Sequence, residues 1–152
     1  MRITNTQIQR LLLLFWGAWF AIVALTNLGD ALLALGVVSP DWKFASGNFG
    51  LIEQVVSRYP TPGWLTMPLF VGVILWEGLA AVLFLRAAAT WSAGDADAGA
   101  RAAARTAYAV GIGLFAGFLL VDEFFIAYQM EGSHLRILVA HVVGLMFLEA
   151  GR

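Results

Sequence analysis

Residues 11–38 read LLLLFWGAWFAIVALTNLGDALLALGVV, and Asp30 is the only charged residue among them. A helix needs about 20 mostly apolar residues to cross the hydrocarbon core of a bilayer. This stretch is longer than that, so its helix would tilt or project beyond the membrane. Because a backbone in lipid must satisfy its own hydrogen bonds, the stretch predicts a membrane-spanning helix.

Three further apolar stretches follow, near residues 64–85, 106–129 and 135–150, and the last of them is the shortest. Of the 152 residues, 61% are hydrophobic and 12% are charged, whereas a soluble domain has about 25% charged residues. The sequence therefore predicts one all-α domain over residues 1–152, an integral membrane four-helix transmembrane bundle.

The placement of Lys and Arg residues predicts the orientation of this bundle. With a cytoplasmic N-terminus, the cytoplasmic side would hold Arg2, Arg10, Arg86, Arg101, Arg105 and Arg152, and the outer side would hold Lys43, Arg58 and Arg136. Cytoplasmic loops carry an excess of positive charge, so we expect both termini in the cytoplasm. The net charge of −1 offers no basic surface for nucleic acid, and the expected partner is the lipid bilayer.

The predicted outer loop, residues 39–63, has a helical pattern of its own. Asn48 is a residue type that often caps a helix. Apolar residues follow it at helical spacing, namely Phe49, Ile52, Val55, Val56 and Tyr59. Pro60 and Pro62 would end the segment. We predict a short amphipathic helix on the membrane surface, which is either a lid over the outer ends of the bundle or a cover for a ligand or partner.

The apolar stretches also contain polar residues that water would not easily reach. They are Asn27, Asp30, Glu77, Asp122, Glu123 and His141. An ionisable group near a bilayer centre costs about 2.5–3.5 kcal/mol on insertion scales. All of these residues can lie in the middle-to-outer half of one bundle. Together with Gln129 and Arg136, they form the candidate site for a ligand or for protons.

The carboxylic acids of this set cannot all be ionised together in a dry core, because burial and like charge both oppose ionisation. Either some of them are protonated or a cation neutralises them. Arg136 lies near the outer end of the fourth stretch, and its long side chain could bend inward. We predict that Arg136 pairs with Asp122 or Glu123, and that His134, near the same boundary, is interfacial.

Each of the other polar residues has a structural and a functional interpretation. Asn27 suits hydrogen bonding between helices or contact with a ligand. Asp30 lies closer to the outer end, where it is either hydrated or part of a site. Glu77 is either a protonated group bonded to a neighbouring helix or a site residue. His141 is either a satisfied core histidine or a metal ligand.

A metal site is not expected. Di-iron bundles use Glu-x-x-His pairs on helices, and the buried groups lack that spacing. Glu131 and His134 have it, but Gly132 and Ser133 between them predict a short outer turn. The sequence contains no cysteine, nucleophile elbow, HExxH motif or P-loop. We therefore expect no metal, no cofactor and no catalytic residue.

Small residues on the third stretch predict close helix packing. Gly113 and Gly117 form a GxxxG pair, and Ala107 with Gly111 forms a second pair of small residues. Such pairs let two helices approach closely. The partner helix belongs either to the same chain or to a second copy or a larger membrane complex.

A family resemblance rests on residues that are scattered over most of the chain. They are Asn27, Asp30, Asn48-Phe49, Glu77, Glu123-Phe124-Phe125, Tyr128-Gln129 and Arg136. In these positions the chain resembles a bacterial family of predicted small integral membrane proteins, a domain of unknown function. The family tends to have Gly-Glu-Trp in the third span, where this chain has Asp122 and Phe124 around Glu123. The resemblance implies four spans and a bacterial inner membrane, and it implies no activity.

These observations favour a non-enzymatic scaffold or accessory subunit, whose buried polar cluster binds a small ligand or protons. The small extramembrane mass supports this interpretation, because little of the chain lies outside lipid. One alternative is a proton or ion relay, or a transport element, centred on Glu77, Glu123 and His141. Another is a membrane enzyme assisted by a metal or cofactor.

Overall fold

The computed structural model describes residues 4–91 and 98–150, and within these ranges it is helical without strands. Its elements are α1 (Asn5–Ala34), α2 (Asn48–Val56), the 3-10 helix η1 (Gly63–Leu65), α3 (Thr66–Thr90), α4 (Ala98–Phe124) and α5 (Tyr128–Ala150). The predicted all-α bundle with a short helix in the first outer loop is therefore confirmed. Arg2 and Arg152, which contributed to the orientation argument, lie outside the described residues.

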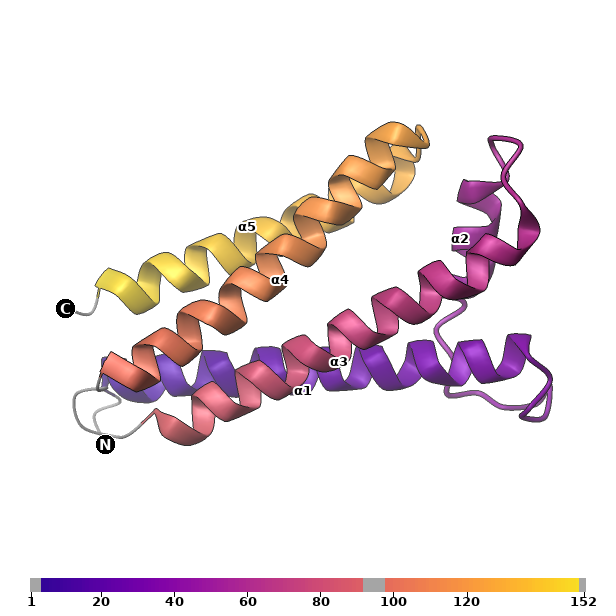
Figure 1. Ribbon diagram of the computed structural model, residues 1–152. Coiled ribbons are helices and arrows are strands. Elements are labelled where there is room, and N and C mark those ends of the chain that lie inside the picture. The colour runs from indigo at the N-terminus through magenta and orange to yellow at the C-terminus, as the bar shows by residue number, and fades with distance from the viewer. Residues whose placement is uncertain (1–3, 92–97, 151–152) are drawn as a thin grey trace.

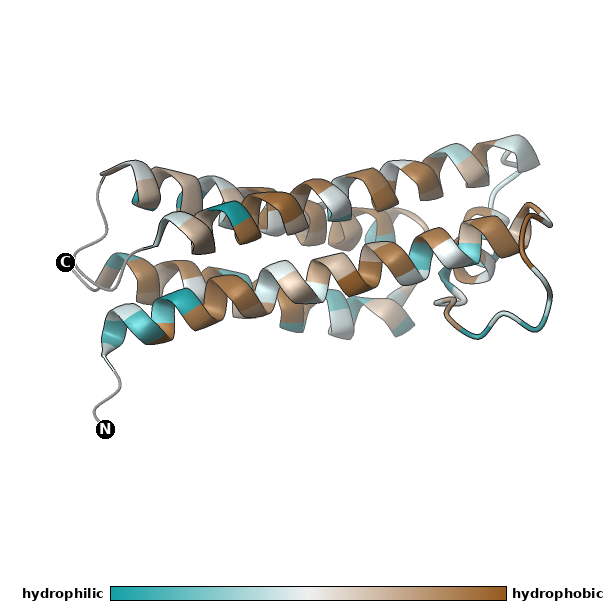
Figure 2. Ribbon diagram, turned by 90° about the horizontal axis from the view of Figure 1, so that it is seen from below, coloured by the Kyte–Doolittle hydropathy of each residue, from teal (hydrophilic) through white to brown (hydrophobic). Residues whose placement is uncertain are grey.

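Four helices are long and apolar enough to cross a membrane: Asn5–Ala34, Gly63–Thr90, Ala98–Phe124 and Tyr128–Ala150. Hydrophobic residues extend along most of their length, and hydrophilic residues gather nearer their ends (Figure 2). The start of α1 and the end of α5 lie at the same end of the bundle (Figure 1). This arrangement is that of a multi-pass membrane protein with four spans.

The ends of α1 are defined by capping. At the start, Thr4 and Gln7 bond to each other's backbone N–H groups in a capping box. At the other end, Gly36 has φ +69°, and the N–H groups of Gly36 and Val37 donate to the carbonyls of Leu33 and Leu32. This is the Schellman arrangement, which needs a left-handed residue. The helix therefore ends at Ala34 and not at residue 38.

The turn between α4 and α5 lies earlier than the sequence predicted. α4 ends at Phe124, and α5 has begun by Tyr128. Ile126 takes the left-handed position with φ 55°, and the N–H of Ala127 donates to the carbonyl of Asp122 at 2.7 Å. A β-branched residue with positive φ is unusual, so the sequence has no signal for this turn. The predicted turn at Gly132 and Ser133 is wrong, because both residues are helical.

The long helices pack in the order α1, α3, α4, α5, and α1 and α5 meet mainly through side chains, such as those of Trp16 and His141. The pair α1 and α3 diverges from the pair α4 and α5 toward the end that carries α2 (Figure 1). Aromatic side chains fill the middle of the bundle, chiefly Trp16, Phe20, Phe84, Tyr108 and Phe115. The bundle is therefore tightly packed in its middle, and its two helix pairs separate near α2.

Glycines allow close packing at particular points of the bundle. A Cβ at Gly111 would lie 2.6 Å from Cδ2 of His141, whereas a Cβ at Gly113 would reach Trp76 at 3.4 Å. A Cβ at Gly117 would meet no described atom within 4 Å. Packing within the chain therefore accounts for Gly111 and in part for Gly113, but not for Gly117.

The short helix α2 begins at Asn48, but Asn48 is not its cap. Gly47 is the N-cap residue and has a left-handed backbone. Asp30 of α1 accepts a hydrogen bond from the N–H of Phe49 at 2.7 Å, and the Ser46 hydroxyl accepts one from the N–H of Asn48 at 3.1 Å. A carboxylate at a helix N-terminus satisfies free N–H groups and complements the helix dipole. Asp30 thus anchors α2 to α1.

Candidate ligand-binding pocket

A pocket of about 270 Å³ lies where the two helix pairs separate. Helix α2 and the adjoining parts of α1, α3, α4 and α5 enclose it. Its apolar walls consist of Leu51, Ile52, Val55, Val56, Leu69, Phe70, Val73, Phe118, Val121, Phe125 and Met130. Its polar groups are Asn27, Asn48, Glu77, Asp122 and His134. Ligand sites in proteins commonly have this composition, mostly apolar with a few polar groups that converge.

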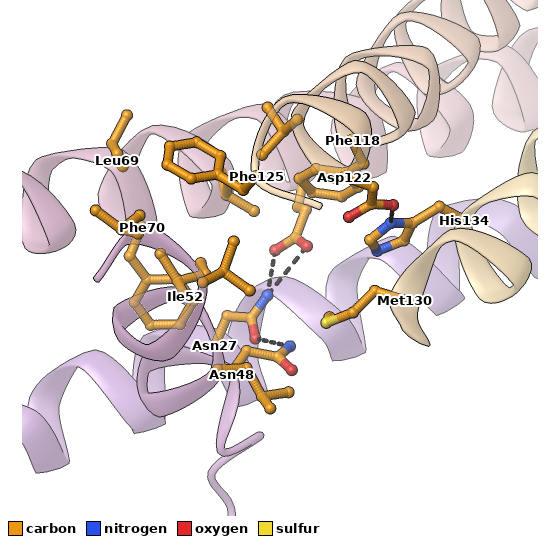
Figure 3. Close-up of a pocket in the computed structure, with 16 residues that line it drawn as sticks. Asn27, Asn48, Ile52, Leu69, Phe70, Phe118, Asp122, Phe125, Met130 and His134 are labelled. Atoms are coloured by element: carbon orange, nitrogen blue, oxygen red, sulfur yellow. Dashed lines mark hydrogen bonds and ion pairs between the residues drawn. The ribbon is translucent and has the colours of Figure 1, made fainter. Parts of the chain in front are cut away.

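Two asparagines link three helices on one side of the pocket. Nδ2 of Asn48 donates to Oδ1 of Asn27 at 2.8 Å. Nδ2 of Asn27 in turn lies 3.0 and 2.8 Å from Oε1 and Oε2 of Glu77. The first bond orients the Asn27 amide, so that its NH₂ group faces Glu77. Asn27 therefore combines its predicted role between helices with a place in the pocket wall (Figure 3).

Glu77 is buried, with 4% of its surface exposed. Both of its carboxyl oxygens accept from the same amide nitrogen. No Lys, Arg or His among the described residues forms an ion pair or a hydrogen bond with it. Glu77 is therefore a buried acceptor without a basic partner, and it faces a space large enough for a ligand.

A second carboxyl group, that of Asp122, lines the same pocket. Its Oδ2 atom lies 2.5 Å from Nδ1 of His134, and Asp122 is also 4% exposed. In Figure 3, Asp122 and His134 lie on one side, Asn27 and Asn48 on the other, and the Met130 side chain extends between them. The pocket thus brings together polar groups of all four spans and of α2.

The predicted pairing of Arg136 with a carboxylate of the third span is wrong. Its Nε donates to the carbonyl of Gly132 at 2.7 Å, and its side chain is exposed. Helical residues are about 100° apart, so Arg136 lies on a different face of α5 from His134. His134 points at α4 and takes the role predicted for Arg136, because its Nδ1 atom lies within hydrogen-bond distance of Asp122.

Several candidate residues lie outside the pocket. Glu123 and Gln129 are exposed, and Asp30 caps α2. His141 is fully buried. Its Nδ1 lies 2.9 Å from the carbonyl of Ile137, and its ring is 3.9 Å from that of Trp16 between centroids. Over the described ranges, no hydrogen bond joins any two of Glu77, Glu123 and His141, the residues of the relay interpretation.

The segment after α2 is bonded to the turn between α4 and α5. An Arg58 guanidinium nitrogen donates to the carbonyl of Ile126 at 2.7 Å, and the Tyr59 hydroxyl donates to that of Phe124 at 2.9 Å. The Tyr59 ring also packs against Phe124 and Phe125. Helix α2 is therefore attached to α1 through Asp30 and to the α4–α5 turn through Arg58 and Tyr59.

Sequence reasoning missed His134, Met130 and the apolar walls of this pocket. The signal for the walls was present in the helical spacing of Ile52, Val55 and Val56, which line the pocket from α2. Glu131 and His134 lie together on helix α5 and not in a turn. Even so, no group of three His, Asp or Glu residues in the described part of the chain could hold a metal ion.

Comparison with known proteins gives no match. No family model matches the chain, and no matching curated protein or solved structure was found. The functional argument therefore rests on the pocket and on the four spans.

Proposed function

We propose that this protein is a non-enzymatic, multi-pass membrane protein that binds a small amphiphilic molecule in the pocket between α2 and the four spans. The observation that carries the proposal is the combination of two buried carboxyl groups, Glu77 and Asp122, with an otherwise mostly apolar cavity of about 270 Å³. Apolar walls suit the body of an amphiphile, and the converging polar groups suit its head.

A purely structural role explains less of this region. Hydrogen bonding between helices accounts for Asn27, and capping accounts for Asp30. Neither role requires a cavity, because protein interiors are normally packed as densely as organic crystals. The relay centred on Glu77, Glu123 and His141 has no supporting geometry, since these side chains lie in three different environments.

The proposed setting is a bacterial inner membrane with both termini in the cytoplasm, and membership of the small integral membrane family that the sequence resembles. The charges support this orientation: Arg10 near the start of α1, Arg86 near the end of α3, and Arg101 and Arg105 near the start of α4 belong to the same end of the bundle. The proposed partners are the bilayer and a second copy of the chain or a larger membrane complex. The second copy or complex would pack at Gly117, where a Cβ atom would meet no described atom within 4 Å.

Photoaffinity labelling of the purified protein in lipid nanodiscs tests the binding function. The probe is an aryl diazirine with an alcohol head, and phenethyl alcohol is the competitor. We expect labelling around Val55 of α2 and around Phe125, which directly follows α4, and an excess of competitor should abolish it. Labelling of lipid-facing residues would not saturate, and a complete lack of competition would contradict the proposal.

A matched pair of variants on α3 localises the binding. Val73 lines the pocket, whereas Val82 is 63% exposed toward the lipid. Val73→Trp would fill the cavity and remove the competed labelling, and Val82→Trp would leave it unchanged. Equal effects of the two variants would show that the labelled site is not this pocket.

A further inference from the structure

We call the polar end of the pocket the part formed by Asn27, Asn48, Glu77, Asp122 and His134. This end has more acidic than basic groups. Glu77 has no basic partner among the described residues, and Asp122 has only His134. Two arginines of this end are engaged elsewhere, Arg58 with the carbonyl of Ile126 and Arg136 with that of Gly132, and Lys43 does not line the pocket. The pocket therefore has two carboxyl groups and one imidazole, so its acidic groups outnumber its basic groups by one.

The pocket also presents acceptors in preference to donors. The amide nitrogen of Asn27 donates to both Glu77 oxygens, and that of Asn48 donates to Oδ1 of Asn27 with one of its two N–H groups. The oxygens of Glu77 and the Oδ1 atom of Asp122 accept, and no described group bonds to this Oδ1 atom. A ligand head that only donates hydrogen bonds would therefore complement the site, whereas a carboxylate or phosphate head would meet like charge.

The walls next to this polar end are rich in aromatic and polarisable side chains. Phe70, Phe118 and Phe125 line the cavity together with Met130. Aromatic faces attract cations, and a methionine side chain adapts to irregular shapes. These walls suit an apolar body that carries a single positive charge.

We infer that the ligand is a lipophilic primary amine, bound as its ammonium ion, with the ammonium group between Glu77 and Asp122 and the apolar body among the phenylalanines. This inference rests on the proposed function, and it adds the chemical class of the ligand. One ammonium ion balances the acidic group in excess, and its three N–H donors can bond to Oδ1 of Asp122 and to the remaining lone pairs of the Glu77 oxygens.

Competition against the photoaffinity probe tests this inference with three molecules of similar size. They are phenethylamine, which is protonated at neutral pH, phenethyl alcohol and phenylpropanoate. We expect the amine to compete at least about tenfold more strongly than the alcohol, and the acid to be the weakest. Equal competition by all three, or the strongest competition by the acid, would overturn the ammonium inference and leave the binding function intact. A lack of competed labelling would overturn both.

A matched pair of carboxamide variants identifies the carboxyl group responsible. Glu77→Gln keeps an acceptor for Asn27 but removes the charge, so phenethylamine should compete no better than phenethyl alcohol. Glu123→Gln changes an exposed carboxyl group at the same end and should leave the tenfold preference unchanged. If Glu77→Gln does not fold, Asp122→Asn should weaken the amine selectively. A preference that persists in both pocket variants would place the ammonium group elsewhere.

Discussion

Two histidines on α5, His134 and His141, lie seven residues apart and experience opposite environments. His134 is half-buried at the edge of the pocket and pairs with Asp122. His141 is fully buried among the rings of Trp16, Phe20 and Phe115, and its bond goes to a carbonyl of its own helix. The same residue type thus serves a polar site in one region and the packing of the core in the other.

The difference arises from the divergence of the helix pairs. Around His141, the helices approach closely enough that Gly111 has no room for a Cβ atom. Around His134, the pairs have separated and leave a cavity that α2 covers. The middle of the bundle therefore stabilises the fold, and the α2 end is free to hold a ligand. Substitutions in the two regions should have distinct effects on stability and on binding.

The largest expected effect is that of His141→Ala in the middle of the bundle. Removing a fully buried ring leaves a cavity, and comparable aromatic truncations cost about 3–5 kcal/mol. Thermal unfolding in detergent would show a large fall in midpoint. His134→Ala should lower stability less, because this side chain borders an existing cavity and the main loss is its bond to Asp122, about 1–3 kcal/mol. Equal losses for the two variants would contradict the contrast between the regions.

A smaller loss is expected from Gly111→Ala on α4. Its new Cβ would overlap the His141 ring, which is held by Trp16 on the other side, and overpacking of this kind costs about 1–3 kcal/mol. Gly117→Ala on the same helix is the control, because that position meets no described atom. The unfolding midpoint should fall for Gly111→Ala alone. A fall for Gly117→Ala alone would show that α4 approaches a neighbouring helix closely at Gly117 and not at Gly111.

At the pocket end, Asp30→Ala should loosen α2 without unfolding the bundle. Loss of a helix cap costs about 1–2 kcal/mol, and here the carboxylate accepts from the N–H of Phe49. Hydrogen exchange of the amides at Phe49 and Ile52 should accelerate, whereas exchange around His141 should stay slow. Uniform acceleration over the whole chain would mean that α2 does not move independently of the bundle.

The sequence was sufficient to predict the four spans, because length and apolar composition alone decide them. It also identified Asn27, Glu77 and Asp122, since buried polar residues are conspicuous in apolar stretches. Depth along a helix does not say which way a side chain points. Glu123 directly follows Asp122, and yet one is exposed and the other is buried.

The sequence could not identify the Asp122–His134 pair, because the pair depends on where the α4–α5 turn falls. Ile126 makes that turn with a positive φ that its residue type disfavours. Gly132 and Ser133, which are common in turns, belong to the helix instead. Moving the turn toward the N-terminus puts His134 on a helical face toward α4, and it separates Arg136 from the carboxyl group.

The smallest expected effect is that of Arg136→Gln. This variant tests most directly that His134, and not Arg136, is the partner of Asp122. The Arg136 guanidinium is exposed and bonds only within its own helix, so stability should change by no more than about 0.5 kcal/mol. His134→Gln removes the ion pair with Asp122 and should change stability more than Arg136→Gln does. The double exchange Asp122→Arg with Arg136→Asp discriminates further by thermal unfolding. If this exchange recovered the stability lost in Asp122→Arg, then Arg136, and not His134, would be the partner of Asp122, and the charge of the pocket would have to be reassigned.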